Sequence, residues 1–289
     1  MSISAKDVMS LRQKTGAGMM DCKKALTETD GDFEAAIKWL REKGIAGASK
    51  RSGRVANEGR IGMLVAADKK TGAIIEINSE TDFVAMNDEF AGLVKVYSDM
   101  ALGMAGEAGE DNMIPVNKFN DVPLKELAGK IGENLGIARA AALSGSFVDS
   151  YMHLGDQLGV LIQLEGEGAT SEAARELAHD LSMQIAAASP LYVTREEVPA
   201  DVIEKEKQIY MSQMRNEGKP EEMIEKIATG KLNKYFEESC LIDQVYVKEQ
   251  KQKVKARVDE AVKAAGAPIE VKAFLRFKVG ETASEDQGE

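Results

Sequence analysis

Residues 61–78 read IGMLVAADKKTGAIIEIN, and this stretch decides the class of fold. The runs 61–66 and 73–78 are rich in β-branched and other apolar residues, while the polar segment 68–72 between them ends in glycine. Two apolar runs joined by a short polar loop with glycine predict a β-hairpin. The residues before this hairpin have a helical period, and those after it alternate between strand and helix patterns. The sequence therefore predicts an α+β protein with antiparallel sheets.

The first 45 residues are expected to form a domain of three short helices. Ser4 and Asp7 have the spacing of a capping box at the start of the first helix. Apolar residues at helical intervals give the third helix one buried face: Phe33, Ala36, Ile37 and Leu40. Gly44 is expected to end that helix, and residues 46–59 are expected to be a linker because they lack an apolar period. Their short basic run could contact RNA, but a solvated linker is the favoured interpretation.

The core is expected to consist of two related halves, the first over 60–144 and the second over 145–189 together with 235–280. The segment LGVLIQL at 158–164 is similar to IGMLV at 61–65, and each precedes a long helical pattern. This weak internal repeat predicts two copies of one α+β unit. Further expected elements are strands at 138–143, 147–153 and 269–279, and helices at 88–102, 124–135 and 171–188.

Residues 190–234 are expected to form a helical hairpin inserted in the second half. Thr194 and Glu197 have the spacing of another capping box. The two helices are expected over 201–216 and 221–234, with Gly and Pro in the turn between them. Apolar residues are sparse in both helices, so the pair is expected to protrude from the core.

Composition and charge favour a protein that binds other proteins in the cytoplasm. The chain has 289 residues, and its formal net charge is -11. Proteins that bind nucleic acids usually carry the opposite charge, because they neutralise phosphates with Lys and Arg. Direct contact with nucleic acid is therefore not expected. The first residues lack the apolar segment of a signal peptide, and no apolar run approaches the roughly 20 residues of a membrane span.

The patterns that indicate catalysis, metal binding or cofactor binding are missing from the sequence. The phosphate-binding pattern G-x-x-x-x-G-K-[ST] does not occur. His153 and His179 fall in different halves, and Cys22 and Cys240 match no zinc spacing, so both cysteines are expected to be buried thiols. Because no nucleophile, base and orienting group occur together, we expect neither an enzyme nor a bound metal or cofactor.

Several blocks of the chain carry a resemblance to one family. They are LRQKTGAGMMDCKKAL at 11–26, NSETDFVA at 78–85, KIGEN at 130–134 and SYMH at 150–153. In these blocks the chain resembles the elongation factor Ts family. The resemblance implies a three-helix domain like the ubiquitin-associated domains, a core of two related halves and a helical hairpin that can form a homodimer. Members of the family carry a C-terminal helical module, whereas only the polar, acidic residues 281–289, expected to fray, follow the last strand here.

The resemblance also implies a function. A member of this family binds the GTPase elongation factor Tu with GDP bound, displaces its magnesium and promotes release of GDP. The resemblance places Phe83 between two helices of the GTPase and Asp82 near the magnesium. It assigns partner contacts to the motif residues Thr81, Asp82, Phe83 and Val84, and to Arg12, Met19, Met20, Lys23, Ile131 and His153.

Reasoning from the residues alone leaves alternatives open. Phe83 follows a strand end and is flanked by Asp82 and Asn87, which indicates an exposed position, but it could also be a core residue of the sheet. Met19 or Met20 could belong to the small core, although two adjacent methionines cannot both face it. His153 could be a structural residue of its strand. A different class of function, a scaffold that binds ubiquitin-like or peptide ligands, would need the three-helix domain alone.

Overall fold

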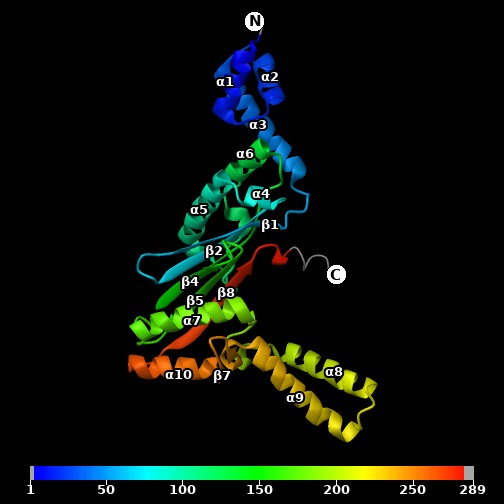
Figure 1. Ribbon diagram of the computed structural model, residues 1–289, viewed down its shortest axis with the longest axis vertical. Coiled ribbons are helices and arrows are strands. Elements are labelled where there is room, and N and C mark those ends of the chain that lie inside the picture. Colours follow the sequence, from blue (N-terminus) through cyan, green and yellow to red (C-terminus); the bar gives the residue numbers. More distant parts are fainter. Residues whose placement is uncertain (1–2, 283–289) are drawn as a thin grey trace. The chain divides into compact units, whose positions relative to one another are not determined.

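The computed structural model describes residues 3–282, and most of its helices and strands are labelled in Figure 1. The chain forms two units. Unit 1 consists of Met1–Met63, Ile75–Ala141 and Phe277–Glu289, and unit 2 consists of Leu64–Ile74 and Ala142–Arg276. The expected α+β class is confirmed. Of the expected tail at 281–289, residues 283–289 lie outside the described part of the chain.

Unit 1 begins with three helices, as expected: α1 (Ala5–Thr15), α2 (Met19–Glu28) and α3 (Phe33–Arg51). The capping box at the start of α1 is present, because the Ser4 side chain accepts from the Asp7 backbone N–H and the Asp7 side chain accepts from that of Ser4. A small core joins the three helices through buried side chains: Val8, Leu11, Cys22, Ala25, Leu26 and Ala36.

The expected end of the third helix at Gly44 is wrong. Helix α3 continues to Arg51, so the first residues of the expected linker are helical. Gly44 lies where α3 crosses α6 (Val122–Ile131), and a Cβ built on it would lie 3.4 Å from the Cα of Gly129. Arg51 adds a hydrogen bond from its guanidinium to the carbonyl of Ala128 at 2.9 Å. This close packing against α6 outweighs the low helix propensity of glycine.

A three-stranded sheet and two helices follow. The sheet has the order β1-β2-β3, with β1 at Glu58–Val65, β2 at Thr71–Ser79 and β3 at Gly136–Ser144. Helix α5 (Asp88–Gly103) buries Phe90 and Tyr97, and Asn87 caps its first turn. Short elements complete this part of the chain: α4 (Asp82–Ala85), η1 (Ala105–Glu107) and η2 (Val116–Lys118).

Helix α6 ends four residues earlier than expected. The apolar period continues to Leu135, which suggested a longer helix, but the last helical residue is Ile131. Gly132 ends it in the left-handed conformation, with φ of 90°, and its N–H bonds to the carbonyl of Ala128. This is the usual glycine ending of a helix, and it turns the chain toward β3.

Unit 2 is built on a second three-stranded sheet. Its order is β4-β5-β8, with β4 at Phe147–His153, β5 at Leu158–Glu165 and β8 at Glu270–Lys278. Strands β4 and β5 are antiparallel, with Phe147 opposite Leu164 and His153 opposite Leu158. Helix α7 (Glu172–Ala188) packs on this sheet and also contacts α10 (Val254–Ala265). A core cluster of buried side chains joins these elements.

The two sheets share one connectivity, with the second strand of a hairpin at the centre and a helix before the third strand. The central strands are β2 and β5. The similarity noted in the sequence paired residues 158–164 with 61–65, but 61–65 belongs to β1 at a sheet edge. The expected repeat is therefore present in the topology with a different pair of equivalent strands.

The insertion of unit 2 is a helical hairpin, as expected, with α8 at Ala200–Asn216 and α9 at Glu221–Ser239 (Figure 1). The expected capping box at Thr194 is wrong: the Thr194 side chain caps nothing, and Glu197 accepts from the Val193 backbone N–H at 2.8 Å. Short elements flank the hairpin: η3 (Arg195–Glu197), η4 (Leu241–Asp243), β6 (Val245–Tyr246) and β7 (Glu249–Lys253). Within residues 3–282, no helix is long and apolar enough to cross a membrane.

Candidate functional site

Phe83 is a large apolar side chain that points into solvent. It is the second residue of the one-turn helix α4, which follows β2 directly, and 82% of it is exposed. Its neighbours Val84 and Ala85 are 8% and 3% exposed and hold the turn against the body of unit 1. Successive helical residues point about 100° apart, so anchoring these two leaves Phe83 outside. Phe83 is thus exposed, as the acidic flanks indicated, on a helical turn instead of in a loop.

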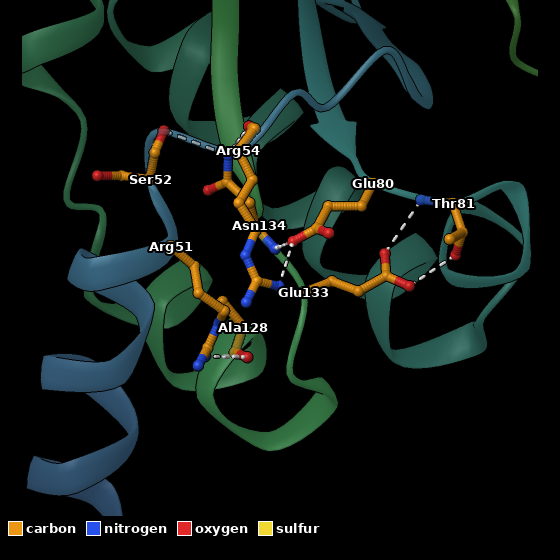
Figure 2. Close-up of polar contacts among 8 residues, drawn as sticks. All are labelled: Arg51, Ser52, Arg54, Glu80, Thr81, Ala128, Glu133 and Asn134. Atoms are coloured by element: carbon orange, nitrogen blue, oxygen red, sulfur yellow. Dashed lines mark hydrogen bonds and ion pairs between the residues drawn. The ribbon is translucent and has the colours of Figure 1, made fainter.

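The backbone that carries Phe83 is fixed at both ends by side chains. Thr81 caps α4, and both its N–H and its hydroxyl donate to the carboxylate of Glu133, at 3.1 and 2.7 Å (Figure 2). At the other end, the Arg60 Nε donates to the carbonyl of Ala85 at 2.5 Å. Asp82 is exposed between these supports. The motif is therefore a helical turn with hydrogen bonds at both ends that presents one aromatic and one carboxylate.

A second set of contacts joins the same region to the chain that leaves α3. The Asn134 backbone N–H donates to Glu80 at 2.6 Å, and the Arg54 guanidinium lies 3.3 Å from the same oxygen. The Asn134 side chain donates to the carbonyl of Arg54 at 2.8 Å. The sequence analysis quoted Glu133 and Asn134 within KIGEN but assigned them no role. Spacing along the chain could not reveal them, since each bonds to residues more than fifty positions away.

The Gly16–Gly18 turn presents a second exposed group. Met19 and Met20 begin α2 and are 42% and 76% exposed, while Cys22 on the same helix is buried. Arg12 and Lys23 are also exposed. Gly16 has φ of 69°, and a Cβ placed on it would collide with the Lys130 side chain. The left-handed conformation favours glycine at this position, whereas the flexible Lys130 side chain could move aside for a Cβ.

Both groups meet at the C-terminal end of α6. Lys130 contacts the Gly16 turn and pairs with Glu89 of α5 at 2.6 Å, while Glu133, three residues later, holds Thr81. Ile131 lies between them and is half-buried. Met86, three residues after Phe83, is 70% exposed, and the sequence analysis missed it. An adaptable methionine at helical spacing from the exposed aromatic was the available signal.

A cavity of about 660 Å³ lies beside the Gly16–Gly18 turn, lined by α3 and α6. Its charged side chains are largely paired with one another. Lys43 donates to Asp21 at 2.5 Å, and Arg41 pairs with Glu126. Lys130 pairs with Glu89 in the same way, so Lys14 and Arg51 leave the lining with an excess of positive charge.

In unit 2, His153 ends β4 and is exposed. Its Nδ1 lies 2.9 Å from the Tyr151 hydroxyl, and the two rings stack with centroids 5.8 Å apart. Leu154, the next residue, has φ of 54° and is 67% exposed at the tip of the β4–β5 hairpin. The tip is thus a further small apolar and aromatic surface, available for contact with a partner.

The chemistry of these groups suits binding to a protein. Within residues 3–282, no three His, Cys, Asp or Glu side chains are grouped so that they could hold a metal ion. Both cysteines are buried thiols, and burial raises the pKa of Cys240 to about 11. What the molecule offers instead is a set of exposed apolar side chains on well-supported backbone, which is typical of protein-binding surfaces.

Comparison with known proteins assigns the family. The model of the family described as Elongation factor TS matches residues 80–281. The elongation factor Ts of Clostridium botulinum strain Eklund 17B (Type B) is 46% identical over 286 residues, which cover 96% of this chain and 93% of that protein. The chain belongs to the elongation factor Ts family. The elongation factor Ts proteins of the C. botulinum strains Alaska E43 (Type E3) and ATCC 19397 (Type A) match with the same identity and coverage.

Membership of the elongation factor Ts family gives the chain a role in translation elongation during protein biosynthesis. The matched range 80–281 contains the turn that carries Phe83, the end of α6 and the β4–β5 hairpin. The resemblance found in the sequence is therefore confirmed, and these features lie in the part of the chain on which the family assignment rests.

Proposed function

We propose that the chain is a guanine nucleotide exchange factor that binds elongation factor Tu with GDP bound, displaces its magnesium and promotes release of GDP. The observation that carries this proposal is the 82% exposure of Phe83 on a turn that its own fold holds in place. A large aromatic kept out of its own core is a strong candidate for the centre of a protein interface.

In this proposal each candidate residue has its own role in binding. Phe83 inserts between two helices of the GTPase, and Asp82 beside it disturbs the region that orders the magnesium. Thr81 and Val84 fix the turn, through the cap and through burial respectively. Ile131 packs beside Phe83 against the same helices. The second exposed group, Arg12, Met19, Met20 and Lys23, contacts another helix of the GTPase, and His153 contacts a different domain.

Exchange requires no bond to be made or broken in the factor itself. If the factor weakens the binding of GDP to the GTPase, GDP must weaken the binding of the factor by the same amount, because coupling between two ligands is reciprocal. Each tenfold weakening needs about 1.4 kcal/mol of differential binding. In this proposal the factor holds no metal or cofactor, acts in the cytoplasm without contacting nucleic acid or membrane, and can form a homodimer through α8 and α9.

The test is release of fluorescent GDP from elongation factor Tu with and without the chain. The proposal expects release to accelerate and to saturate as the concentration of the chain rises. Calorimetry on the pure chain should show no micromolar binding of GDP. Release at the spontaneous rate would overturn the proposal, and a complex that forms without acceleration would favour the scaffold function instead.

A further inference from the structure

Two short segments of unit 1 cap one another. Glu133 accepts from the backbone N–H of Thr81 at 3.1 Å and from its hydroxyl at 2.7 Å. In return, Glu80 accepts from the backbone N–H of Asn134 at 2.6 Å (Figure 2). Each segment thus supplies the carboxylate that satisfies a backbone donor of the other. We call these four residues, Glu80, Thr81, Glu133 and Asn134, the reciprocal clamp.

The turn that carries Phe83 depends on such support. Helix α4 has four residues, and so short a helix is unstable by itself because helix nucleation is costly. Its internal cap is weak, since the Thr81 hydroxyl accepts from the Val84 N–H at 3.4 Å. The exposed Phe83 ring buries little surface in its own fold and adds little stability. The position of Phe83 therefore follows from what holds Thr81 and from the burial of Val84.

We propose that Glu133 is a positioning residue that holds Thr81 and thereby orders the turn before any partner binds. The functional part of this inference rests on the proposed function, in which Phe83 enters the GTPase. A side chain that is ordered in advance loses less freedom on binding, so more of its contact energy is available for displacing GDP. A carboxylate suits this role because both oxygens accept hydrogen bonds, whereas an amide offers one acceptor oxygen.

The clamp also extends to the chain that follows α3. The Asn134 side chain donates to the carbonyl of Arg54 at 2.8 Å, and the guanidinium of Arg54 reaches Glu80 at 3.3 Å. Arg54 lies three residues after the end of α3 at Arg51. Two consecutive residues, Glu133 and Asn134, thus hold both the turn that carries Phe83 and the segment around Arg54 that follows α3.

The first arm of the test uses the free chain and needs no partner. Amide hydrogen exchange of residues 81–86 is compared in the wild type, Glu133→Gln and Glu133→Ala. We expect exchange in this segment to rise about tenfold in Glu133→Ala and less in Glu133→Gln, which keeps one acceptor. Glu110→Ala, at an exposed glutamate elsewhere in unit 1, is the matched control and should change nothing there.

The second arm measures release of GDP from elongation factor Tu at saturating factor. Glu133→Ala should lower the maximal rate about tenfold, with partial recovery in Glu133→Gln. In a Phe83→Ala background, the same change should lower the rate by no more than about twofold, since Glu133 acts through Phe83. If Glu133 had a purely structural role, Glu133→Ala would instead lower the maximal rate of GDP release by the same factor with and without Phe83.

The outcomes separate the two proposals. Unchanged amide exchange in both Glu133 variants, or an equal loss of rate with and without Phe83, would overturn the positioning role. If the wild type fails to accelerate release, the proposed function fails, and the first arm still decides whether Glu133 orders the turn. Should Glu133→Ala not fold, Glu133→Gln carries both arms, because it removes one acceptor oxygen and keeps the shape of the side chain.

Discussion

Phe83 and Phe90 are the same residue type in opposite surroundings. Phe83 is 82% exposed on α4. Phe90 is completely buried in α5, three residues after Asn87, the N-cap residue of that helix. A buried aromatic contributes to the stability of its own fold, whereas an exposed one on a rigid turn can contribute to a complex. The pair therefore offers an internal comparison between folding and binding.

We predict that Phe83→Ala slows release of GDP from elongation factor Tu and leaves thermal stability almost unchanged. Loss of a central interface aromatic costs about 2–4 kcal/mol of coupling, or roughly 30- to 1000-fold in the coupled equilibrium. The rate need not follow this factor fully, because kinetic effects are not bound by reciprocity. Stopped-flow release and thermal melting are measured on the same samples.

Two controls frame this result. Phe90→Ala should cost about 3–5 kcal/mol of folding stability, because it opens a cavity in the core. Val96→Ala, at a residue of α5 that is 49% exposed, should change neither quantity. A large drop in melting temperature for Phe83→Ala, with normal release per folded molecule, would show that Phe83 belongs to the fold.

Asp180 predicts a dependence of stability on pH. Burial raises the pKa of its carboxyl, but hydrogen bonds from Lys248 at 2.6 Å and Arg257 at 2.9 Å outweigh burial and lower the pKa below its ordinary 3.8. A carboxyl with a lowered pKa stabilises the fold above the unfolded value and loses this contribution as pH falls through the folded value. Asp180→Asn should therefore cost more free energy of unfolding at pH 7 than at pH 3.

Urea unfolding at the two pH values checks this expectation. The exposed Asp99, changed to Asn, serves as the comparison on α5. An equal cost of Asp180→Asn at both pH values would mean that the ion pairs joining α7, α10 and the β6–β7 hairpin contribute no pH-dependent stability.

At the scale of elements, the crossing of α3 and α6 depends on two glycines. A Cβ on Gly129 would lie 2.5 Å from the Cα of Gly44, and a backbone atom cannot move aside as a flexible side chain can. We predict that Gly129→Ala destabilises the protein by about 1–3 kcal/mol, although alanine is the better helix former by about 1 kcal/mol.

Gly92→Ala is the matched control within α5. Nothing lies within 4 Å of a Cβ at that position, so the substitution should stabilise the protein by about 0.5–1 kcal/mol. Chemical denaturation of both variants gives the sign of each change in the free energy of unfolding. Stabilisation by Gly129→Ala would show that α3 and α6 can move apart at their crossing without losing folding stability.

The sequence predicted the elements with a clear period and failed where tertiary packing decided. The strands at 61–78 and 147–164 and the helix at 171–188 were found from their apolar patterns. The stop expected at Gly44 did not occur, because Gly44 packs against Gly129, which lies far away in the chain. Helix α10 was missed, although Val254, Val258 and Val262 recur at intervals of four and were a usable signal.

The candidate site was predictable only in part, because local patterns can be seen in the sequence and tertiary contacts cannot. The acidic and amide neighbours of Phe83 indicated an exposed position but left a core position open, and the structure decides for exposure. The support from Glu133 could not, because the hydrogen bond joins residues 52 positions apart and no local pattern encodes it. The roles of all the candidate contact residues in binding stay predictions.

For the whole molecule, we predict that deletion of residues 1–55 leaves a folded chain of lower stability and much lower exchange activity. The deletion removes α3 from α6, where Arg51 bonds to Ala128 and Leu127 is 8% exposed. Uncovering this face should lower the melting temperature, by about 2–4 °C for each kcal/mol lost in a chain of this size. Circular dichroism melting and release of GDP measure the two effects.

The position of the boundary can be tested with a shorter deletion. Removal of residues 1–31 takes away α1 and α2 but keeps α3 against α6. It should reduce exchange activity with a smaller loss of stability than removal of 1–55. Equal melting temperatures for both truncated chains would mean that α3 contributes little to the stability of unit 1.

The order of strands in the second sheet has a consequence for how the protein is made. β5 is buried along nearly its whole length and lies between β4 and β8, yet β5 ends at Glu165 and β8 begins at Glu270. On the ribosome, one edge of an apolar strand stays open while α7, the helical hairpin and α10 are synthesised. An open edge of this kind can pair with another nascent chain. Slow synthesis of this stretch would therefore favour aggregation over folding, in a protein whose own role is in translation.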